Sequence, residues 1–398
     1  MKNKIYFLIK QMSGGGAERV ISLLCNSLAN RGYDVTLIIT HQAITGAKLS
    51  TIHTGVTIIS LEDEVKKTSV RTQKALMLKA RVCRKIGRAF LGKPEDDYLI
   101  EKYAIRNYDK VHWLKRCFSA NEHNILIAFL YDSIYLSLLS AQKNDRKIIS
   151  ERGDPRQCLS SKTNVAFFKS MFPKADMMVF QSPDAMQWYQ DNTAANGKII
   201  FNPVKPDLPD RYDGTRKKRV VNFCRISSQK NLHLLVNSFS LFVNDYPEYE
   251  LYIYGDAVGN GAEGYLEDIK KTICLSGCAQ KIHILPAQKN IHTVIRDYAM
   301  FVSSSDFEGM SNSMLEAMAI GLPTICTDCP AGGARAIIKD HENGILVPVN
   351  DVQAMANAMK EVAGDSTLSE KLSVNGVRIR EKLTLEKIVK QWMEIIND

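Results

Sequence analysis

The sequence lacks any long hydrophobic run. The closest approach to a membrane-spanning stretch, residues 125–141, is interrupted by Asp132. The N-terminal hydrophobic run at residues 5–9 is too short for a signal peptide. We therefore expect a cytoplasmic protein, or one bound peripherally to the cytosolic face of a membrane.

A zinc-binding cysteine pattern is also missing. The nine cysteines are scattered through apolar segments, and residues 279–325 separate the pair Cys274 and Cys278 from the pair Cys326 and Cys329. An odd number in this arrangement favours reduced, buried thiols over disulfides or a metal site.

Two common nucleotide-binding patterns are absent. No Gly-Lys-Ser/Thr motif follows a strand, so the chain has no P-loop. The glycines at 14–16 lie after the first predicted strand, but Arg19 stands where the third glycine of a dinucleotide-binding loop belongs. The next predicted strand, residues 35–40, is not followed by an acidic residue that could bind a ribose, which disfavours NAD. The loop could bring backbone N–H groups close to a phosphate, or it could be a structural turn.

The hydrophobic pattern that is present predicts two α/β domains. A strand, loop, helix and strand occur at residues 5–40 and again at 220–254, as in Rossmann-like folds. Length of 398 residues with 45% hydrophobic content fits two globular domains. Three prolines at residues 202–209 suggest a linker. We expect domains at 1–203 and 217–380, a linker at 204–216, and a C-terminal helix at 381–398 that packs toward the first domain.

Positive charge is concentrated in the first half. Residues 1–203 hold 30 Lys/Arg and 18 Asp/Glu, which leaves 22 and 25 of the totals of 52 and 43 for the remainder. Residues 65–94 contain ten basic residues and no acid, and the predicted helix at about 66–93 is amphipathic. This predicts contact with phosphate groups or anionic lipids, with a solvated helix face as the alternative. The residues on the basic face are Lys67, Arg71, Lys74, Arg81, Lys85 and Arg88.

Residues 298–323 carry the most informative pattern of the second half. A predicted strand ends in three serines, Glu308 follows in a glycine turn, and Glu316 lies on the next helix. The free N–H groups of a helix start favour anions and hydroxyl oxygens, so two acids here suggest a polar, phosphorylated ligand. Alternatively, Ser313 and Glu316 have capping-box spacing and Glu308 is a solvated loop residue.

A pair of cations lies in the loop after the strand at 220–224. Arg225 and Lys230 are placed at the carboxyl edge of a parallel sheet, where ligands of open α/β sheets bind. A guanidinium and an ammonium five residues apart could hold a diphosphate from two sides. Ordinary surface solvation is the alternative.

Together these motifs resemble those of the GT-B fold retaining glycosyltransferases of family 4, also called glycosyl transferases group 1. The resemblance is carried by the Arg225 and Lys230 spacing, the Glu308 and Glu316 spacing, and the runs at 15–19, 202–204, 315–323 and 343–348. These runs extend over nearly the whole chain. The resemblance is to the branch that builds polysaccharides or lipid-linked oligosaccharides.

The resemblance implies an α/β fold of two Rossmann-like domains facing across a cleft, with the C-terminal helix crossing back to the first domain. It implies catalytic roles for Arg225 and Lys230, which would hold the donor diphosphate, and for Glu308, which would bind donor-sugar hydroxyls. Glu316 would bind the ribose hydroxyls. The other substrate-binding residues would be Gly15, Gly16, Gly309, Met310, Ser311 and Asn312, the glycines and the start of the helix acting through backbone N–H groups. No cofactor and no metal are needed, because cations and helix termini take the metal's place.

Two departures from the family pattern concern the sugar. Many relatives place a histidine after a first-domain strand, whereas this chain has Glu151 and Arg152 there. Either could position the substrate, or the two could form a structural ion pair. The second departure is Arg335, near a position where relatives often have glutamate.

The expected activity is transfer of a hexose or N-acetylhexosamine from a nucleotide-diphosphate sugar, expected to be UDP-linked, to a polyprenyl-diphosphate-linked saccharide. Such a step belongs to capsule, exopolysaccharide or glycan assembly. A GT-B enzyme with a soluble acceptor is the alternative. A nucleic-acid-binding protein is disfavoured, because the basic segment has few aromatic residues and the second half is not basic.

Overall fold

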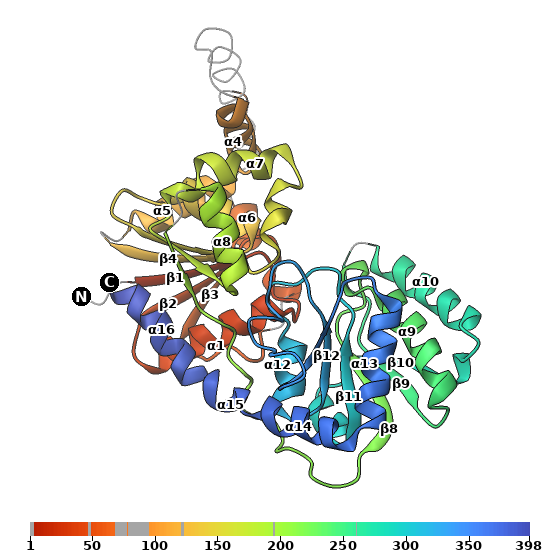
Figure 1. The fold of residues 1–398 in the computed structure, drawn as a ribbon. Helices are drawn as coiled ribbons and strands as arrows, with labels where there is room; N and C mark the ends of the chain where they lie inside the picture. The colour runs from red at the N-terminus through yellow and green to blue at the C-terminus, as the bar shows by residue number, and fades with distance from the viewer. Residues whose placement is uncertain are drawn as a thin grey trace. The chain divides into compact units, whose positions relative to one another are not determined.

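The chain folds into two compact units. The computed structural model describes residues 4–46, 49–67, 78, 95–120, 123–193, 196–259 and 261–398. Unit 1 comprises Met1–Ile200 with Val389–Asp398, and unit 2 comprises Phe201–Ile388. Each unit is a parallel β-sheet covered by helices (Figure 1).

Unit 1 is built on a seven-stranded sheet of order β3-β2-β1-β4-β5-β6-β7, with every pair parallel. Its central strands are continuous hydrophobic runs, as expected for a sheet buried on both faces. In register, Phe7 of β1 lies between Leu37 of β2 and Ile127 of β4. The strands are β1 Lys4–Ile9, β2 Val35–Ile39, β3 Val56–Ser60, β4 Asn124–Phe129, β5 Arg146–Ser150, β6 Met177–Phe180 and β7 Gly197–Ile199.

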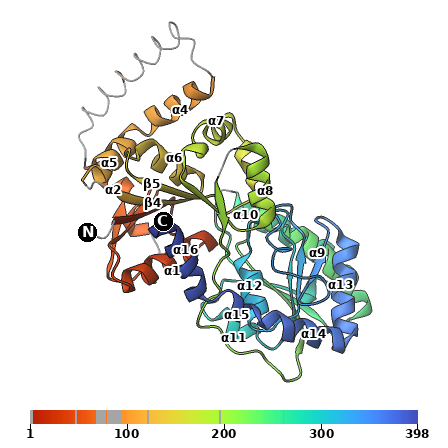
Figure 2. The same ribbon diagram turned by 60° about the vertical axis from the view of Figure 1, so that its left-hand side comes forward.

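Helices cover both faces of this sheet. Figures 1 and 2 show α1 and α16 on one face and α5 and α6 on the other. On the second face, Tyr135 stacks on Phe167 with ring centroids 3.9 Å apart, at the centre of a buried aromatic cluster. The helices are α1 Gly16–Asn30, α2 Leu61–Lys66, α4 Glu95–Arg106, α5 Tyr108–Phe118, α6 Tyr131–Ser140, α7 Lys162–Ser170, α8 Pro183–Asn192 and α16 Leu385–Asn397, with 3-10 turns η1 Ile44–Gly46, η2 Pro155–Leu159 and η3 Phe172–Lys174.

Unit 2 repeats the architecture with a six-stranded parallel sheet of order β10-β9-β8-β11-β12-β13. Its strands are β8 Lys217–Phe223, β9 Glu250–Tyr254, β10 Ile282–Leu285, β11 Tyr298–Ser303, β12 Thr324–Thr327 and β13 Ile345–Val347. Its helices are α9 Leu232–Asp245, α10 Ala262–Leu275, α11 Ile291–Ile295, α12 Asn312–Ala319, α13 Val352–Gly364, α14 Ser366–Val377 and α15 Ile379–Lys382, with 3-10 turns η4 Ser228–Lys230 and η5 Ala279–Lys281. The α/β class and the two parallel-sheet domains are confirmed.

The proline-rich segment after residue 203 is held to unit 2. The N–H of Val204 donates to the carbonyl of Leu383 at 2.9 Å. The guanidinium of Arg380 donates to the carbonyls of Leu208 and Pro209 and, at 2.6 Å, to that of Ala319. The segment expected to be a linker, 204–216, therefore has well-defined hydrogen bonds within a folded unit.

The C-terminal helix α16 begins at Leu385, and its residues from Val389 belong to unit 1. Trp392 is 1% exposed and its ring lies 5.7 Å from that of Phe129 at the end of β4. Lys198 of β7 forms a 2.7 Å ion pair with Glu394 on the same helix. Figures 1 and 2 both show α16 beside α1.

Three further expectations concern surface features. Among the described residues, no helix is both long and apolar enough to cross a membrane. Cys278, Cys326 and Cys329 are buried as expected, but Cys274 is exposed because it lies on the outer side of α10. Of the basic helix face, Lys67 is described and pairs with Glu64 at 2.6 Å, whereas the other residues, Arg71, Lys74, Arg81, Lys85 and Arg88, lie outside the described residues.

Candidate active site

The site in unit 2 begins with the loop that follows β8. This central strand ends at Phe223, and the chain then passes Arg225 and enters the 3-10 turn Ser228–Lys230. Asn231 has a left-handed backbone with φ of 39°, and its side-chain oxygen accepts from the N–H of Leu234 to cap α9. The turn therefore places Lys230 at the carboxyl edge of the sheet.

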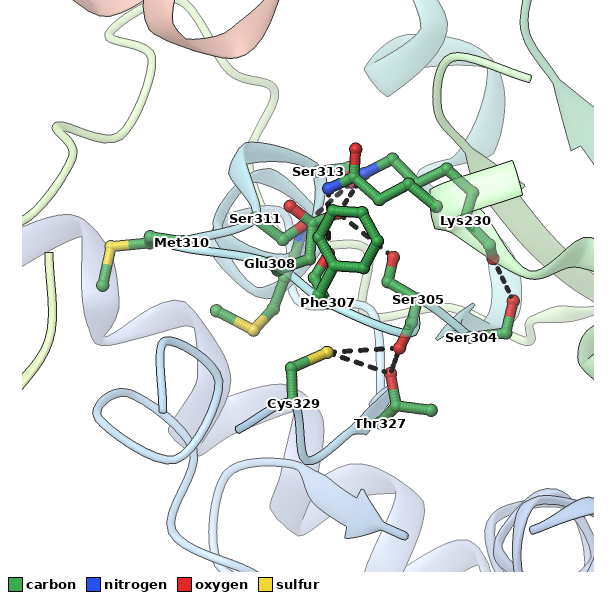
Figure 3. A network of polar contacts seen from close by, with 12 residues as sticks. Lys230, Ser304, Ser305, Phe307, Glu308, Met310, Ser311, Ser313, Thr327 and Cys329 are labelled. Carbon is green, nitrogen blue, oxygen red and sulfur yellow. Dashed lines mark hydrogen bonds and ion pairs between the residues drawn. The ribbon is translucent and has the colours of Figure 1, made fainter. Parts of the chain in front are cut away.

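The loop after the neighbouring strand β11 is bonded to this turn. The hydroxyl of Ser304 donates to the carbonyl of Lys230 at 2.9 Å, and the N–H of Asp306 donates to the carbonyl of Gln229 at 3.0 Å. The side-chain amide of Gln229 donates to the carbonyl of Phe307 at 2.8 Å. These three hydrogen bonds join the two loops, and Figure 3 shows the one between Ser304 and Lys230.

Lys230 and Glu308 form an ion pair at this edge. The ammonium of Lys230 contacts Glu308 Oε1, which also accepts from the hydroxyl of Ser305 at 3.1 Å. The two side chains are only 13% and 17% exposed. Burial, the largest single effect, would lower the pKa of Lys230, but the charge and the hydrogen bond of Glu308, together with the nearby Cys224, leave that pKa raised. Lys230 is therefore a fixed cation at neutral pH, and exposed Arg225 is close enough for its charge to oppose that of Lys230.

The end of β12 and the segment that follows it contact the loop that carries Glu308. The hydroxyl of Thr327 donates to the carbonyl of Ser305 at 2.6 Å, and the thiol of Cys329 donates to the same oxygen at 3.2 Å (Figure 3). Gly333 lies against the loop so closely that a Cβ there would be 1.6 Å from the carbonyl oxygen of Gly309. The turn at Gly309 thus depends on a residue without a side chain.

Helix α12 starts at the end of this loop. Its N-cap is Ser311, whose hydroxyl accepts from the N–H of Met314 at 3.3 Å. The side-chain amide of Asn202 donates to Asn312 Oδ1 at 2.8 Å and to the carbonyl of Met310 at 3.4 Å. Met310 is buried, and its sulfur accepts from the N–H of Asn202 at 3.5 Å.

Glu316 has a different partner from the one that its spacing suggested. The capping-box alternative with Ser313 is wrong, because the N-cap of α12 is Ser311, whose hydroxyl accepts from the N–H of Met314. Glu316 Oε2 lies 2.7 Å from His292 Nε2, and both residues are buried. No sequence pattern marks His292 as this partner, because it is a lone histidine 24 positions upstream of Glu316.

The glycine loop of unit 1 is occupied by a side chain of the protein. Glu18 Oε2 accepts from the N–H groups of Ser13, Gly14 and Gly15, the last at 2.8 Å. Gly15 is the N-cap of α1 and Gly16 its first residue. The N–H of Gly15, expected to help bind phosphate, thus donates to an internal carboxylate.

Glu151 and Arg152 lie at the end of β5 in unit 1. Burial raises the pKa of Glu151 to about 7, although the N–H of Gly153 donates to its carboxylate at 2.9 Å. Burial lowers the pKa of Arg152 to about 9. Arg152 has a left-handed φ of 71° and its guanidinium lies 4.5 Å from the centroid of the Phe129 ring. Such strain and burial are typical of a functional position.

Other expected features can be placed as well. Arg335 forms a 2.7 Å ion pair with Asp328, just after β12. The described residues contain no group of three or more His, Cys, Asp or Glu side chains placed to hold a metal ion. Within unit 2 the structure brings Lys230 and Glu308 into contact and places Glu316 in a separate pair.

Parts of the chain are similar in sequence or in fold to known proteins. Residues 217–365 match the family described as Glycosyl transferases group 1. An N-acetylgalactosaminyltransferase of Campylobacter jejuni that acts on an undecaprenyl-diphosphate-linked saccharide is 23% identical over 400 residues, which cover 99% of this chain and 98% of that protein.

Some relatives are much longer than the aligned part. An exopolysaccharide phosphotransferase of Streptomyces coelicolor is 26% identical over 230 residues, which cover 57% of this chain and only 24% of that protein. Among solved structures, Anabaena HepE in complex with UDP and glucose has a TM-score of 0.77 at 16% identity, with 99% of each chain covered. At this identity the likeness shows the fold. Residues 217–365 therefore match the glycosyl transferases group 1 family, and the chain as a whole has the same two-domain α/β fold as that solved structure.

Proposed function

We propose that the protein is a retaining glycosyltransferase that needs no metal. It would move a hexose or N-acetylhexosamine from a UDP-linked donor to a polyprenyl-diphosphate-linked saccharide. The observation that carries this is the partly buried ion pair of Lys230 and Glu308 at the carboxyl edge of the unit 2 sheet, inside the matched domain. It supplies a fixed cation and a carboxylate side by side.

The chemistry of sugar transfer needs both groups. The departing nucleoside diphosphate gains negative charge as the bond from the sugar C1 to its oxygen breaks, and stabilising that charge is the main catalytic demand. Lys230 and Arg225 would receive this charge. Glu308 accepts hydrogen bonds and can orient the sugar hydroxyls, while the acceptor hydroxyl forms the new bond to C1 and loses its proton to the departing phosphate oxygen.

The donor and acceptor are proposed from the relatives. A neighbour in fold was solved with UDP and glucose, and the full-length Campylobacter relative acts on an undecaprenyl-diphosphate-linked saccharide. The basic residues of the segment 65–94 would hold the lipid diphosphate or anionic headgroups at the cytosolic membrane face. A soluble acceptor is the competing possibility.

The test is an assay of the purified chain with UDP-glucose, UDP-galactose, their N-acetylamino forms and GDP-mannose. We expect one UDP-sugar to be hydrolysed slowly and to be transferred to an undecaprenyl-diphosphate-linked saccharide in vesicles, with the α-configuration of the donor kept in the product. EDTA should leave the rate unchanged. The proposal is wrong if no sugar nucleotide is turned over, or if Lys230→Met keeps the wild-type rate.

The acceptor is tested separately. If the acceptor is at the membrane, the protein should sediment with anionic vesicles and be released at high salt, because surface attraction is screened. A variant of the chain in which Lys67, Arg71 and Lys74 are changed to Glu should stay in the supernatant. If that variant is as active as the wild type on the vesicle-bound acceptor, the basic residues do not bring the enzyme to the membrane. A soluble acceptor is then favoured.

A further inference from the structure

Helices α11 and α12 are joined by a buried hydrogen bond between two charged or chargeable side chains. His292 Nε2 lies 2.7 Å from Glu316 Oε2, and the side chains are 9% and 7% exposed. A carboxylate removed from water in this way needs a partner, because its desolvation is costly. His292 supplies that partner from a helix of only five residues.

The imidazole of His292 is itself fixed in place. Ile291 and Ile295 are buried, so helix α11 is packed against the unit on either side of His292. The edge of the Phe223 ring meets the His292 ring at a centroid distance of 5.7 Å and an interplanar angle of 87°. Phe223 is backed in turn by Phe301 at 5.1 Å. Hydrophobic packing therefore determines where Nε2 points.

We propose that His292 is a positioning residue for the nucleotide: it holds the Glu316 carboxylate in the orientation that accepts hydrogen bonds from the ribose hydroxyls. This inference rests on the proposed function, in which Glu316 binds the ribose. The Glu316 side chain has three rotatable bonds, and fixing it before the ligand arrives removes an entropic cost from binding. Partners that orient a binding group are known to change affinity without touching the ligand.

A purely structural role for the pair makes a different prediction. If the hydrogen bond only joins α11 to α12, its loss lowers stability and affects all ligands of unit 2 alike. If the hydrogen bond orients Glu316 for the ribose, its loss weakens only the part of the binding affinity that depends on the ribose hydroxyls. Comparing a ligand with and without the 2′-hydroxyl therefore separates the two roles.

The experiment is calorimetric titration with UDP and with 2′-deoxy-UDP. Wild-type protein should prefer UDP by about tenfold, the value of a hydrogen bond to a charged group. In His292→Leu the preference should fall to within about twofold, while binding of 2′-deoxy-UDP changes by less than about threefold. His292→Gln, which retains an N–H donor, should recover part of the preference.

The matched control is His233→Leu, since His233 pairs with Thr272 and Asp268 elsewhere in unit 2 and should leave the preference intact. If the Leu variant does not fold, His292→Asn serves instead, because its shorter amide does not reach Glu316. An unchanged UDP preference in the His292 variants, or no preference in the wild type, overturns the inference while UDP binding still supports the proposed function. Failure of the wild type to bind any nucleoside diphosphate overturns both.

Discussion

Lys230 and Glu308 are in direct contact across two loops that are 78 positions apart in the sequence. The pair is mostly buried, so each charge depends on the other. A diphosphate bound at this edge would attract Lys230 away from Glu308, and the carboxylate would then be available to sugar hydroxyls. In the proposed function, the contact would thus link the group that binds the diphosphate to the group that binds the sugar.

A double-mutant cycle tests that link. Lys230→Met should lower the free energy of unfolding by about 2–3 kcal/mol, because Glu308 remains buried without its cation. Adding Glu308→Gln should restore about 1–2 kcal/mol, since the new amide carries no charge to leave unpaired. Urea unfolding of the four proteins measures the coupling. Simple additivity of the two single effects would contradict a coupled pair.

The turn beneath the site gives a second prediction, at Gly333. Gly333→Ala should displace the backbone at Gly309, because the new Cβ would overlap its carbonyl oxygen. We expect a loss of roughly 2–4 kcal/mol of stability and weaker UDP binding, as is usual for overpacking against backbone. Thermal unfolding and calorimetry measure the two effects.

Gly264→Ala is the matched control for that glycine. Gly264 lies inside α10, and a Cβ there meets nothing within 4 Å. The same chemical change should therefore stabilise the protein by about 0.5–1 kcal/mol, because alanine favours the helix. Equal effects at the two positions would show that the close approach at Gly309 is unimportant.

Most of the strands could be predicted from the sequence. Central strands such as β1, β4 and β11 are uninterrupted hydrophobic runs followed by turn residues, and that pattern is unambiguous in a buried parallel sheet. Strand β7, of sequence Gly-Lys-Ile, was not predicted because three residues with one hydrophobic side chain carry no periodic signal. It becomes a strand through its pairing with β6.

The side-chain contacts of the site residues could not be predicted from the sequence. Lys230 and Glu308 were each predicted, but their contact depends on β8 and β11 being neighbours in the sheet. His292 pairs with Glu316 through packing of α11, which no local spacing encodes. The contact of Glu18 with the glycine loop could not be predicted, because an acid in the first turn of a helix is common. Its hydrogen bonds to the loop N–H groups form only in the folded loop.

Glu18 leads to the third prediction. A single carboxylate oxygen accepts three backbone N–H groups of the loop, and charge-assisted bonds of this kind are stronger than neutral ones. Glu18→Gln should cost about 1 kcal/mol, and Glu18→Ala about 1–2 kcal/mol, because the partly buried N–H groups lose their charged acceptor. Amide exchange at Ser13 to Gly15 should accelerate in the same order. Unchanged exchange in Glu18→Ala would mean that other acceptors hold the loop.

The fourth prediction concerns Glu151 and pH. Burial raises the pKa of its carboxyl from about 4.5 to about 7. Between these values the unfolded chain releases a proton that the folded protein keeps, so the unfolded state gains stability as pH rises. The contribution of neutral Glu151 is thus fully present below pH 4.5 and is lost as pH rises through 7. From pH 5 to pH 8 the loss should be about 2–3 kcal/mol.

Glu151→Gln isolates this effect, because the amide stays neutral at every pH and can still accept from the N–H of Gly153. The variant should match the wild type near pH 5 and become more stable than it by about 2 kcal/mol at pH 8. Urea unfolding at half-unit intervals measures the difference, with the exposed Glu386→Gln on α16 as the control for removing a carboxylate. A constant difference across the range would show that Glu151 ionises equally in the folded and unfolded states. A difference that grows with pH would show that the Glu151 carboxyl, directly after β5, keeps its proton to a higher pH in the folded protein than in the unfolded chain.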